Sequence, residues 1–220
     1  MKNKVIYTRI VALALMTIIG ISTTYAQNST QALSKVSARY KKYKTIEANF
    51  AFKYFRNEQD QAAQSETGSI LLDQRTGKYR ITTPSQVLIS DGKSQWAVLH
   101  DADEVQVTEV DQAAGSITPF NVFSFFESGY THRLLPAERA GNIQLDVIEL
   151  TPEDKRKNYS KIILRVDPSK SHLHSVTVFD KNKSRYSYEI SNLKIEPTLA
   201  ANKFMFDKAE FPGMEIVDLR

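Results

Sequence analysis

The residues in this sequence best suited to bind a metal ion are two closely spaced histidines, His172 and His174. In an extended segment, residues two apart point to the same face, so the two imidazoles could share a metal ion. No acidic residue or third histidine can be assigned to complete the ligand set. The acidic run at 101–104, "DADE", joins two strand patterns and lacks the spaced oxygen ligands of a calcium loop. We therefore predict surface histidines, a solvated turn and no metal site.

Catalytic motifs are missing from the sequence as well. The chain has no cysteine, which excludes thiol catalysis, disulfides and cysteine-ligated zinc. It has no G-x-S-x-G turn, no H-E-x-x-H helix and no glycine-rich phosphate loop. Carboxylates are numerous, but nothing in the sequence brings a chosen pair together for acid–base catalysis. We predict a protein that is not an enzyme and uses no cofactor; an exported hydrolase with unrecognised catalytic residues is the alternative.

The most apolar segment after the N-terminus is "TPFNVFSFFESG" at 118–129. Thr118 is a good N-cap, Pro119 suits the first turn and Gly129 is a typical stop, so we predict a short helix over 118–128. Its apolar side chains extend around most of the helix, which must therefore be covered on more than one side. The residues alone leave two interpretations open, a lid over an apolar cavity or ordinary core between helix and sheet. The side chains concerned are Phe120, Val122, Phe123, Phe125 and Phe126.

The first 26 residues have the pattern of a cleaved signal peptide. Three basic residues precede an apolar run at 10–21, and Ala26 is a suitable cleavage residue. The run is shorter than the roughly 20 residues that a transmembrane anchor needs. Cleavage would leave a domain at 27–220 with 26 of the 29 Lys and Arg and all 25 Asp and Glu, a net charge of +1. This balance argues against nucleic-acid binding and, with no cysteine to carry lipid, predicts a soluble, exported single domain.

The remaining sequence predicts one helix followed by many strands. Asn28 can cap a helix over 28–44, in which apolar residues recur at helical spacing. Turn residues then separate strand patterns at 46–56, 69–74, 78–84, 86–91, 94–100, 104–110, 143–150, 160–167, 174–180, 185–195 and a short piece at 204–206. Because hairpins connect them, we predict an α+β, mainly antiparallel fold, in which about eleven strands curl into a barrel or half-barrel.

Several predicted strands are apolar on both faces, namely 70–72, 87–89, 97–99 and 162–164. A sheet with one wet face would alternate more regularly, so other elements must pack against it. The candidates are the helices at 28–44 and 118–128 and a turn of helix at 134–141.

In this order, the segments resemble the LolA family of periplasmic lipoprotein carriers over essentially the whole chain after residue 26. "SARYKKYKTIEANFAFKY" is similar to the opening helix and strand of the family, and "GSILLDQRTGKYRITTP" to its Gly, strand, Arg-Pro and aromatic segment. "VLISDGKSQWAV" resembles its Asp-Gly-Lys hairpin. "LDVIELTP" and "FMFDKAEFPGMEIVDLR" resemble its later strand and its C-terminal ending.

The resemblance implies an incomplete, unclosed β-barrel with a hydrophobic cavity for acyl chains. Helices would form a lid over this cavity, with the five apolar residues of 120–126 gating it. It also implies that Arg75 is a latch that hydrogen-bonds toward the lid. Aligning the arginines requires one extra residue after Gly68, and Thr76 stands where the family has proline. A surface arginine in a turn is the alternative. The implied cavity lining is Ile70, Leu72, Tyr79 and Trp96, and for Trp96 the alternative is ordinary core.

The same resemblance implies a function and partners. The protein would be a monomeric chaperone in the periplasm of a Gram-negative bacterium, carrying lipoproteins from an inner-membrane releasing complex to an outer-membrane acceptor. Since a fold does not determine its cargo, the alternative is a carrier or sensor of another lipid or apolar ligand.

Overall fold

The computed structural model describes residues 29–57, 61–110 and 121–220. The predicted signal peptide at 1–26, the predicted cap Asn28 and the segment 118–120, which includes Phe120, lie outside the described residues. Within these residues, no helix is long and apolar enough to span a membrane.

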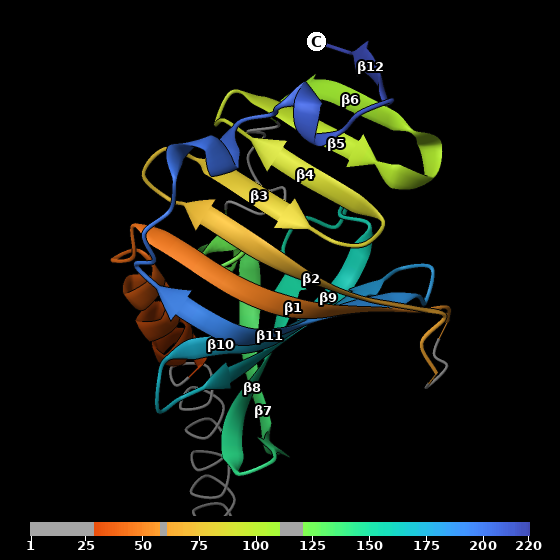
Figure 1. The fold of residues 1–220 in the computed structure, drawn as a ribbon. Coiled ribbons are helices and arrows are strands. Elements are labelled where there is room, and N and C mark those ends of the chain that lie inside the picture. The colour runs from red at the N-terminus through yellow and green to blue at the C-terminus, as the bar shows by residue number, and fades with distance from the viewer. Residues whose placement is uncertain (1–28, 58–60, 111–120) are drawn as a thin grey trace, which may run out of the picture.

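Twelve strands form one sheet in the described residues (Figure 1). They are β1 (Thr45–Phe55), β2 (Gln64–Asp73), β3 (Lys78–Thr82), β4 (Gln86–Ser90), β5 (Ser94–Leu99), β6 (Glu104–Glu109), β7 (Tyr130–Ala140), β8 (Ile143–Pro152), β9 (Tyr159–Asp167), β10 (His172–Asp180), β11 (Arg185–Ile195) and β12 (Glu215–Asp218). Their order is β12-β6-β5-β4-β3-β2-β1-β11-β10-β9-β8-β7. Neighbouring strands are antiparallel except for the parallel pair of β12 and β6. Since β12 and β7 end the order, the sheet is open, which confirms the predicted unclosed antiparallel architecture.

Four short 3-10 helices accompany the sheet in the part of the chain that the structure describes, and two of them correct predictions. They are η1 (His100–Ala102), η2 (Phe125–Glu127), η3 (Ala201–Phe204) and η4 (Lys208–Glu210). The prediction of a strand at 204–206 is wrong. Residue 204 belongs to η3, and in the sheet that the structure describes no strand pairs with this segment. The prediction of a helix at 118–128 is also wrong for the residues that the structure describes, because 121–124 form turns and the 3-10 helix η2 follows them. So short a helix gains little stability of its own, and packing determines its conformation.

The prediction of a turn of helix at 134–141 is wrong too, because residues 134–140 belong to β7 and residue 141 to the turn that follows it. β7 contains Pro136, but it is an edge strand and its register shifts between Leu135 and Glu138. Edge strands and bulges are the places where a sheet tolerates proline. The short strand β12 was not predicted.

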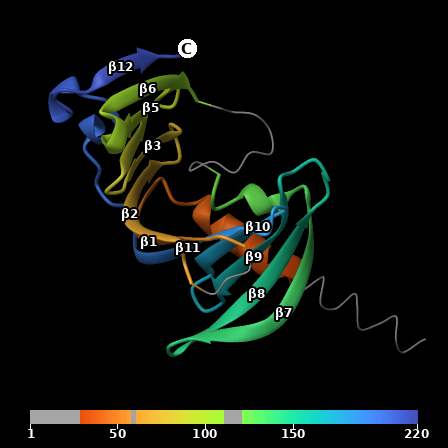
Figure 2. The same cartoon turned by 90° about the vertical axis from the view of Figure 1, so that its right-hand side faces the viewer.

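The predicted N-terminal helix is confirmed over 29–40, with a turn at 41–42. Leu33, Val36 and Tyr40 are buried at helical spacing against the sheet. Figure 2 shows this helix inside the curve of the sheet, between β1 and the β7–β8 hairpin. We call the face of the sheet that carries the helix the concave face and the opposite face the convex face.

Each face of the sheet has its own apolar cluster. Leu88 packs into the cluster on the concave face, whereas its neighbours Val87 and Ile89 belong to a second cluster on the convex face. This split follows from strand alternation and explains why these strands are apolar on both sides. The convex cluster is covered by Phe206, Phe211 and Met214 of the C-terminal segment, which crosses β3 and β4 in Figure 1. No helix predicted from the sequence provides that cover.

Candidate apolar binding face

The concave face is the best candidate for a binding surface, because it carries most of the apolar residues expected to contact a ligand. Leu72 pairs with Ile46 on one side and Tyr79 on the other, and Ile70 pairs with Ile81. Residues paired across strands share a face, so the predicted lining residues Ile70, Leu72 and Tyr79 lie together on this surface. Leu72 and Tyr79 are buried, and Ile70 is half-buried.

Part of the concave face is occupied by a unit that we call the plug, defined as residues 29–43 and 121–127. The ring of Tyr40 stacks on Phe123 with centroids 4.1 Å apart. Lys41 Nζ donates to Glu127 Oε2 at 2.7 Å, and the Ser37 hydroxyl donates to the same carboxylate. These hydrogen bonds lower the pKa of Glu127. The helix and the phenylalanine segment therefore pack as one unit.

Beneath the plug the described residues form packed core. Phe123 and Phe126 are buried, while Val122 and Phe125 are half-buried and pack against the same cluster. The cluster beneath them includes Ile148, Leu150, Ile162, Leu164, Val176 and Val178. The predicted gating residues that the structure describes thus lie on the concave face, and in this conformation they fill it.

Beyond the plug, the concave face carries partly exposed aromatic residues that we call the aromatic ledge, defined as Phe50, Phe52, Tyr186 and Tyr188. Tyr188 is 38% exposed, and its ring centroid lies 5.2 Å from that of Phe52 and 6.0 Å from that of Phe50. Burial raises the pKa of Tyr186 to about 12, so its phenol is neutral. The ledge therefore offers an uncharged aromatic surface that an apolar chain could contact.

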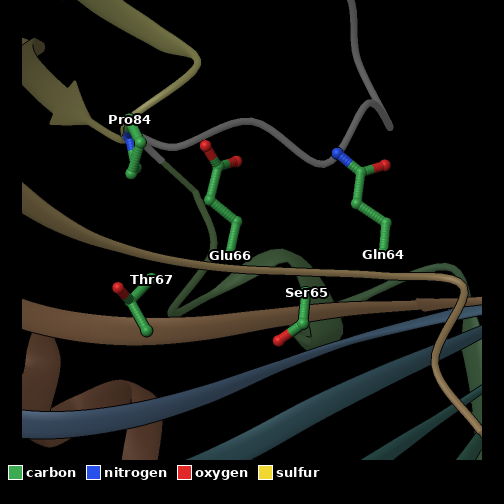
Figure 3. Close-up of a pocket in the computed structure, with 5 residues that line it drawn as sticks. All are labelled: Gln64, Ser65, Glu66, Thr67 and Pro84. Atoms are coloured by element: carbon green, nitrogen blue, oxygen red, sulfur yellow. The ribbon is translucent and has the colours of Figure 1, made fainter.

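A polar rim adjoins the ledge. Gln64, Ser65, Glu66, Thr67 and Pro84 line a pocket of about 390 Å³, in which Gln64 and Glu66 point to one side of β2 (Figure 3). Glu66 pairs with Phe52 across β1 and β2, so its carboxylate lies next to the ledge. Glu66 Oε1 accepts a hydrogen bond from the Ser85 amide at 2.8 Å. Although burial opposes the shift, hydrogen bonds from Ser85 and Thr83 lower the pKa of Glu66, so the rim carries a negative charge.

The expected latch, Arg75, lies in the turn between β2 and β3 and contacts that turn. Its Nε and Nη2 atoms lie 3.4 Å from the carboxylate oxygens of Asp73, and its side chain is 60% exposed. The neighbouring Gln74 contacts the plug instead. Gln74 Nε2 donates to the carbonyl oxygens of Tyr40 at 3.0 Å and Tyr43 at 3.1 Å. Counted from Gly68 without an extra residue, the resemblance would place the family arginine at position 74, so this spacing could have pointed to Gln74.

Trp96 was expected to line the same cavity, and its position corrects that expectation. It belongs to the convex cluster, where its ring stacks on Phe206 at a centroid distance of 5.9 Å. The reason is the register of β5, because Trp96 pairs with Ile89, which also faces the convex side. Trp96 therefore holds the C-terminal segment against the sheet.

The two histidines of the possible metal pair are directed to different partners. Tyr43 of the plug lies 3.1 Å from His172 Nε2, whereas His174 Nε2 lies 3.8 Å from Glu189 of β11. Across the ranges that the structure describes, no three His, Cys, Asp or Glu side chains are grouped so that they could hold a metal ion.

The fold and the site together define a class of protein in which an open β-sheet curves around a plug of side chains, with the aromatic ledge and the polar rim beside the plug. The chain belongs to the LolA family, since residues 41–207 match the family model described as outer membrane lipoprotein carrier protein LolA. An outer-membrane lipoprotein carrier protein of Coxiella burnetii (strain CbuK_Q154) is 26% identical over 194 residues, covering 84% of this chain and 86% of that protein. The crystal structure of an uncharacterized conserved protein from Thermus thermophilus shares the fold, with a TM-score of 0.58 and 10% identity over 87% of this chain and 99% of that one.

Proposed function

We propose that this protein is a periplasmic chaperone that binds the acyl chains of lipoproteins and carries them toward the outer membrane. The observation that carries the proposal is the concave face, where a side-chain plug lies beside an aromatic ledge and a charged rim. Family membership supports lipoproteins as the cargo, and the proposed role is binding without chemical turnover. The N-terminal 26 residues would direct export.

The plug gives such a carrier a way to release its cargo. Burying one CH₂ group is worth about 0.8 kcal/mol, so one acyl chain of about 16 carbons gains roughly 12 kcal/mol when fully enclosed. A carrier that enclosed several chains tightly could not release them. If the plug must leave the concave face before the chains enter, closing the plug competes with the ligand and weakens net binding. An inner-membrane releasing complex and an outer-membrane acceptor would then set the direction of transfer.

The ledge and the rim together suit an amphiphilic ligand. Acyl chains would contact Phe50, Phe52 and Tyr188, while the polar start of the polypeptide would lie near the carboxylate of Glu66. This arrangement favours a lipid-modified protein over a purely apolar molecule. A carrier of another lipid is the second candidate, because the ledge itself does not select among acyl chains.

The test is to purify the protein from the periplasm of its native host without detergent and to identify what is bound by mass spectrometry. We expect acylated lipoprotein, and we expect the empty protein to extract lipoproteins from inner-membrane vesicles. A consistently empty protein that extracts nothing would contradict the proposal. A protein-free lipid as the only occupant would support the second candidate.

We also propose that the turn containing Gln74 and Arg75 is the latch and that Gln74 makes its essential contact. Gln74→Leu removes two hydrogen bonds to the plug, so the free energy of unfolding should fall by about 1–2 kcal/mol. Apolar-ligand affinity should rise several-fold, because the plugged state is the one that loses the bonds. Denaturant titration and fluorescent-probe binding measure the two effects.

Arg75→Leu is the matched variant, in the same turn and with the same new side chain. Because the Arg75 guanidinium is exposed and pairs with Asp73 of its own turn, we expect little change in either measurement. A larger effect on ligand affinity at Arg75 than at Gln74 would assign the latch to the arginine.

A further inference from the structure

A chain of three side chains joins the plug to β10, and its direction is determined by hydrogen-bonding capacity. Arg39 Nε donates to the Tyr43 hydroxyl at 2.6 Å, and that oxygen lies 3.1 Å from His172 Nε2. A guanidinium has no acceptor, so Tyr43 accepts from Arg39 and has its own proton to donate. Within this chain, the acceptor for that proton is His172 Nε2, which must therefore be unprotonated.

Protonation of His172 would break this arrangement. An imidazolium has two N–H donors and no acceptor, so the Tyr43 proton would lose its partner and two cations would face one hydroxyl. Burial lowers the pKa of His172, Arg39 and Lys170 act in the same direction, and Asp167 opposes them. The plugged state thus favours neutral His172.

A second histidine, His132 of β7, faces the other end of the helix. Its Nδ1 atom lies 3.4 Å from Thr30 Oγ1, and its Nε2 atom is buried. Burial lowers the pKa of His132, against the opposing effects of the Phe126 backbone and Glu153. A proton on His132 would place a charge among the helix, Phe126 and β7.

We infer that the plug is a proton-sensitive closure, which His132 and His172 hold against the sheet when neutral and loosen when protonated. The inference rests on the proposed function, in which opening the plug admits the ligand. Both histidines are easier to protonate in the open state than in the plugged state. The plugged state is therefore most stable, relative to the open state, above the ordinary histidine pKa of about 6.5, and it loses stability as the pH falls below that value. A histidine that protonates only in the open state would raise ligand affinity by up to about 30-fold at pH 5.

The experiment is a titration with Nile red, an apolar probe without charge, at pH 7.5 and pH 5.0. We expect the affinity of the native protein to rise by about tenfold at the lower pH. In the double variant His132→Gln and His172→Gln, the glutamine oxygen at 172 can still accept from Tyr43 but cannot gain a proton. We expect its affinity to change less than twofold.

His174→Gln is the matched control, because His174 lies on the same strand as His172 but pairs with Glu189, away from the plug. This variant should keep the full pH response. A native protein whose Nile red affinity is independent of pH would overturn the inference, as would a double variant that responds like the native protein. Absence of Nile red binding at both pH values would overturn the proposed function as well.

Should the double variant fail to fold, NMR titration of the imidazoles in the native protein gives an independent test. We expect His132 and His172 to titrate below the ordinary histidine range when the protein is empty and to return toward it when Nile red is bound. Identical titrations with and without Nile red would overturn the inference.

Discussion

Replacing Phe123 by alanine is expected to tighten the binding of apolar ligands while it destabilises the fold. Phe123 is 4% exposed and stacks on Tyr40, so its loss should lower the free energy of unfolding by about 3–5 kcal/mol. If the plug leaves the concave face on ligand binding, part of the lost free energy destabilises the plugged state relative to the open state. Each 1.4 kcal/mol on that equilibrium corresponds to about tenfold in affinity. Denaturant titration should therefore show a lower free energy of unfolding, while probe binding should show a higher affinity.

Phe52→Ala is the matched variant, since it removes the same side chain from the aromatic ledge. Phe52 is half-buried, so we expect a loss of about 1 kcal/mol in unfolding free energy. Its ring would contact the ligand directly, and affinity for apolar ligands should fall. Weaker binding in both variants would contradict the competition between plug and ligand, and Phe123 would then be ordinary core.

The sheet could be predicted because strand periodicity is a local property. The apolar run of β9, "KIILRV", and the alternation in β6, "EVQVTE", each indicate a strand without knowledge of their neighbours. β7 and β12 could not be predicted in this way. β7 contains Pro136, which only an edge position or a bulge permits, and β12 is a short strand that depends on pairing with β6.

The candidate site was predictable in composition but not in arrangement. The phenylalanines at 120–126 identified the segment that would cover the sheet, yet only tertiary packing determines that Phe123 stacks on Tyr40. The contact with the helix is made by Gln74 and not by the predicted Arg75, because the length of the turn after β2 decides which of the two side chains reaches the helix. The sequence alone does not single out His132, which becomes a candidate only because β7 places its ring beside Thr30 of the helix.

The two covers of the sheet are attached by different kinds of interaction. The C-terminal segment on the convex face is joined to the sheet by backbone pairing of β12 with β6 and by the ion pair of Arg80 with Glu210. Among the described residues, the plug is held by apolar packing and by side-chain hydrogen bonds that it forms with Gln74, His132 and His172. An apolar ligand can replace the packing contacts once these few side-chain hydrogen bonds break, whereas a paired strand would have to leave the sheet. This difference supports the plug as the movable cover.

Gly68→Ala is the second substitution for which we expect a large effect, because Gly68 is the point where the aromatic ledge packs onto the sheet. A Cβ atom there would lie 2.5 Å from Phe50 Cζ, 2.7 Å from the Thr82 carbonyl oxygen and 2.9 Å from Thr83 Cγ2. The Phe50 ring could rotate away, but the Thr82 carbonyl belongs to the backbone of the neighbouring strand. We expect the free energy of unfolding to fall by about 1–3 kcal/mol and apolar-ligand affinity to fall as Phe50 is displaced.

The double variant Gly68→Ala with Phe50→Ala separates the clash with Phe50 from the two clashes with Thr82 and Thr83. Removing the ring relieves the contact at Phe50 and leaves the other two, so the two substitutions should be less destabilising together than the sum of the single variants. Denaturant titration of the four proteins in this cycle measures the coupling. A Gly68→Ala variant as stable as the native protein, with unchanged ligand affinity, would mean that Phe50 does not need the glycine beneath it. The close approach of β2 to the ledge would then have no part in shaping the binding face.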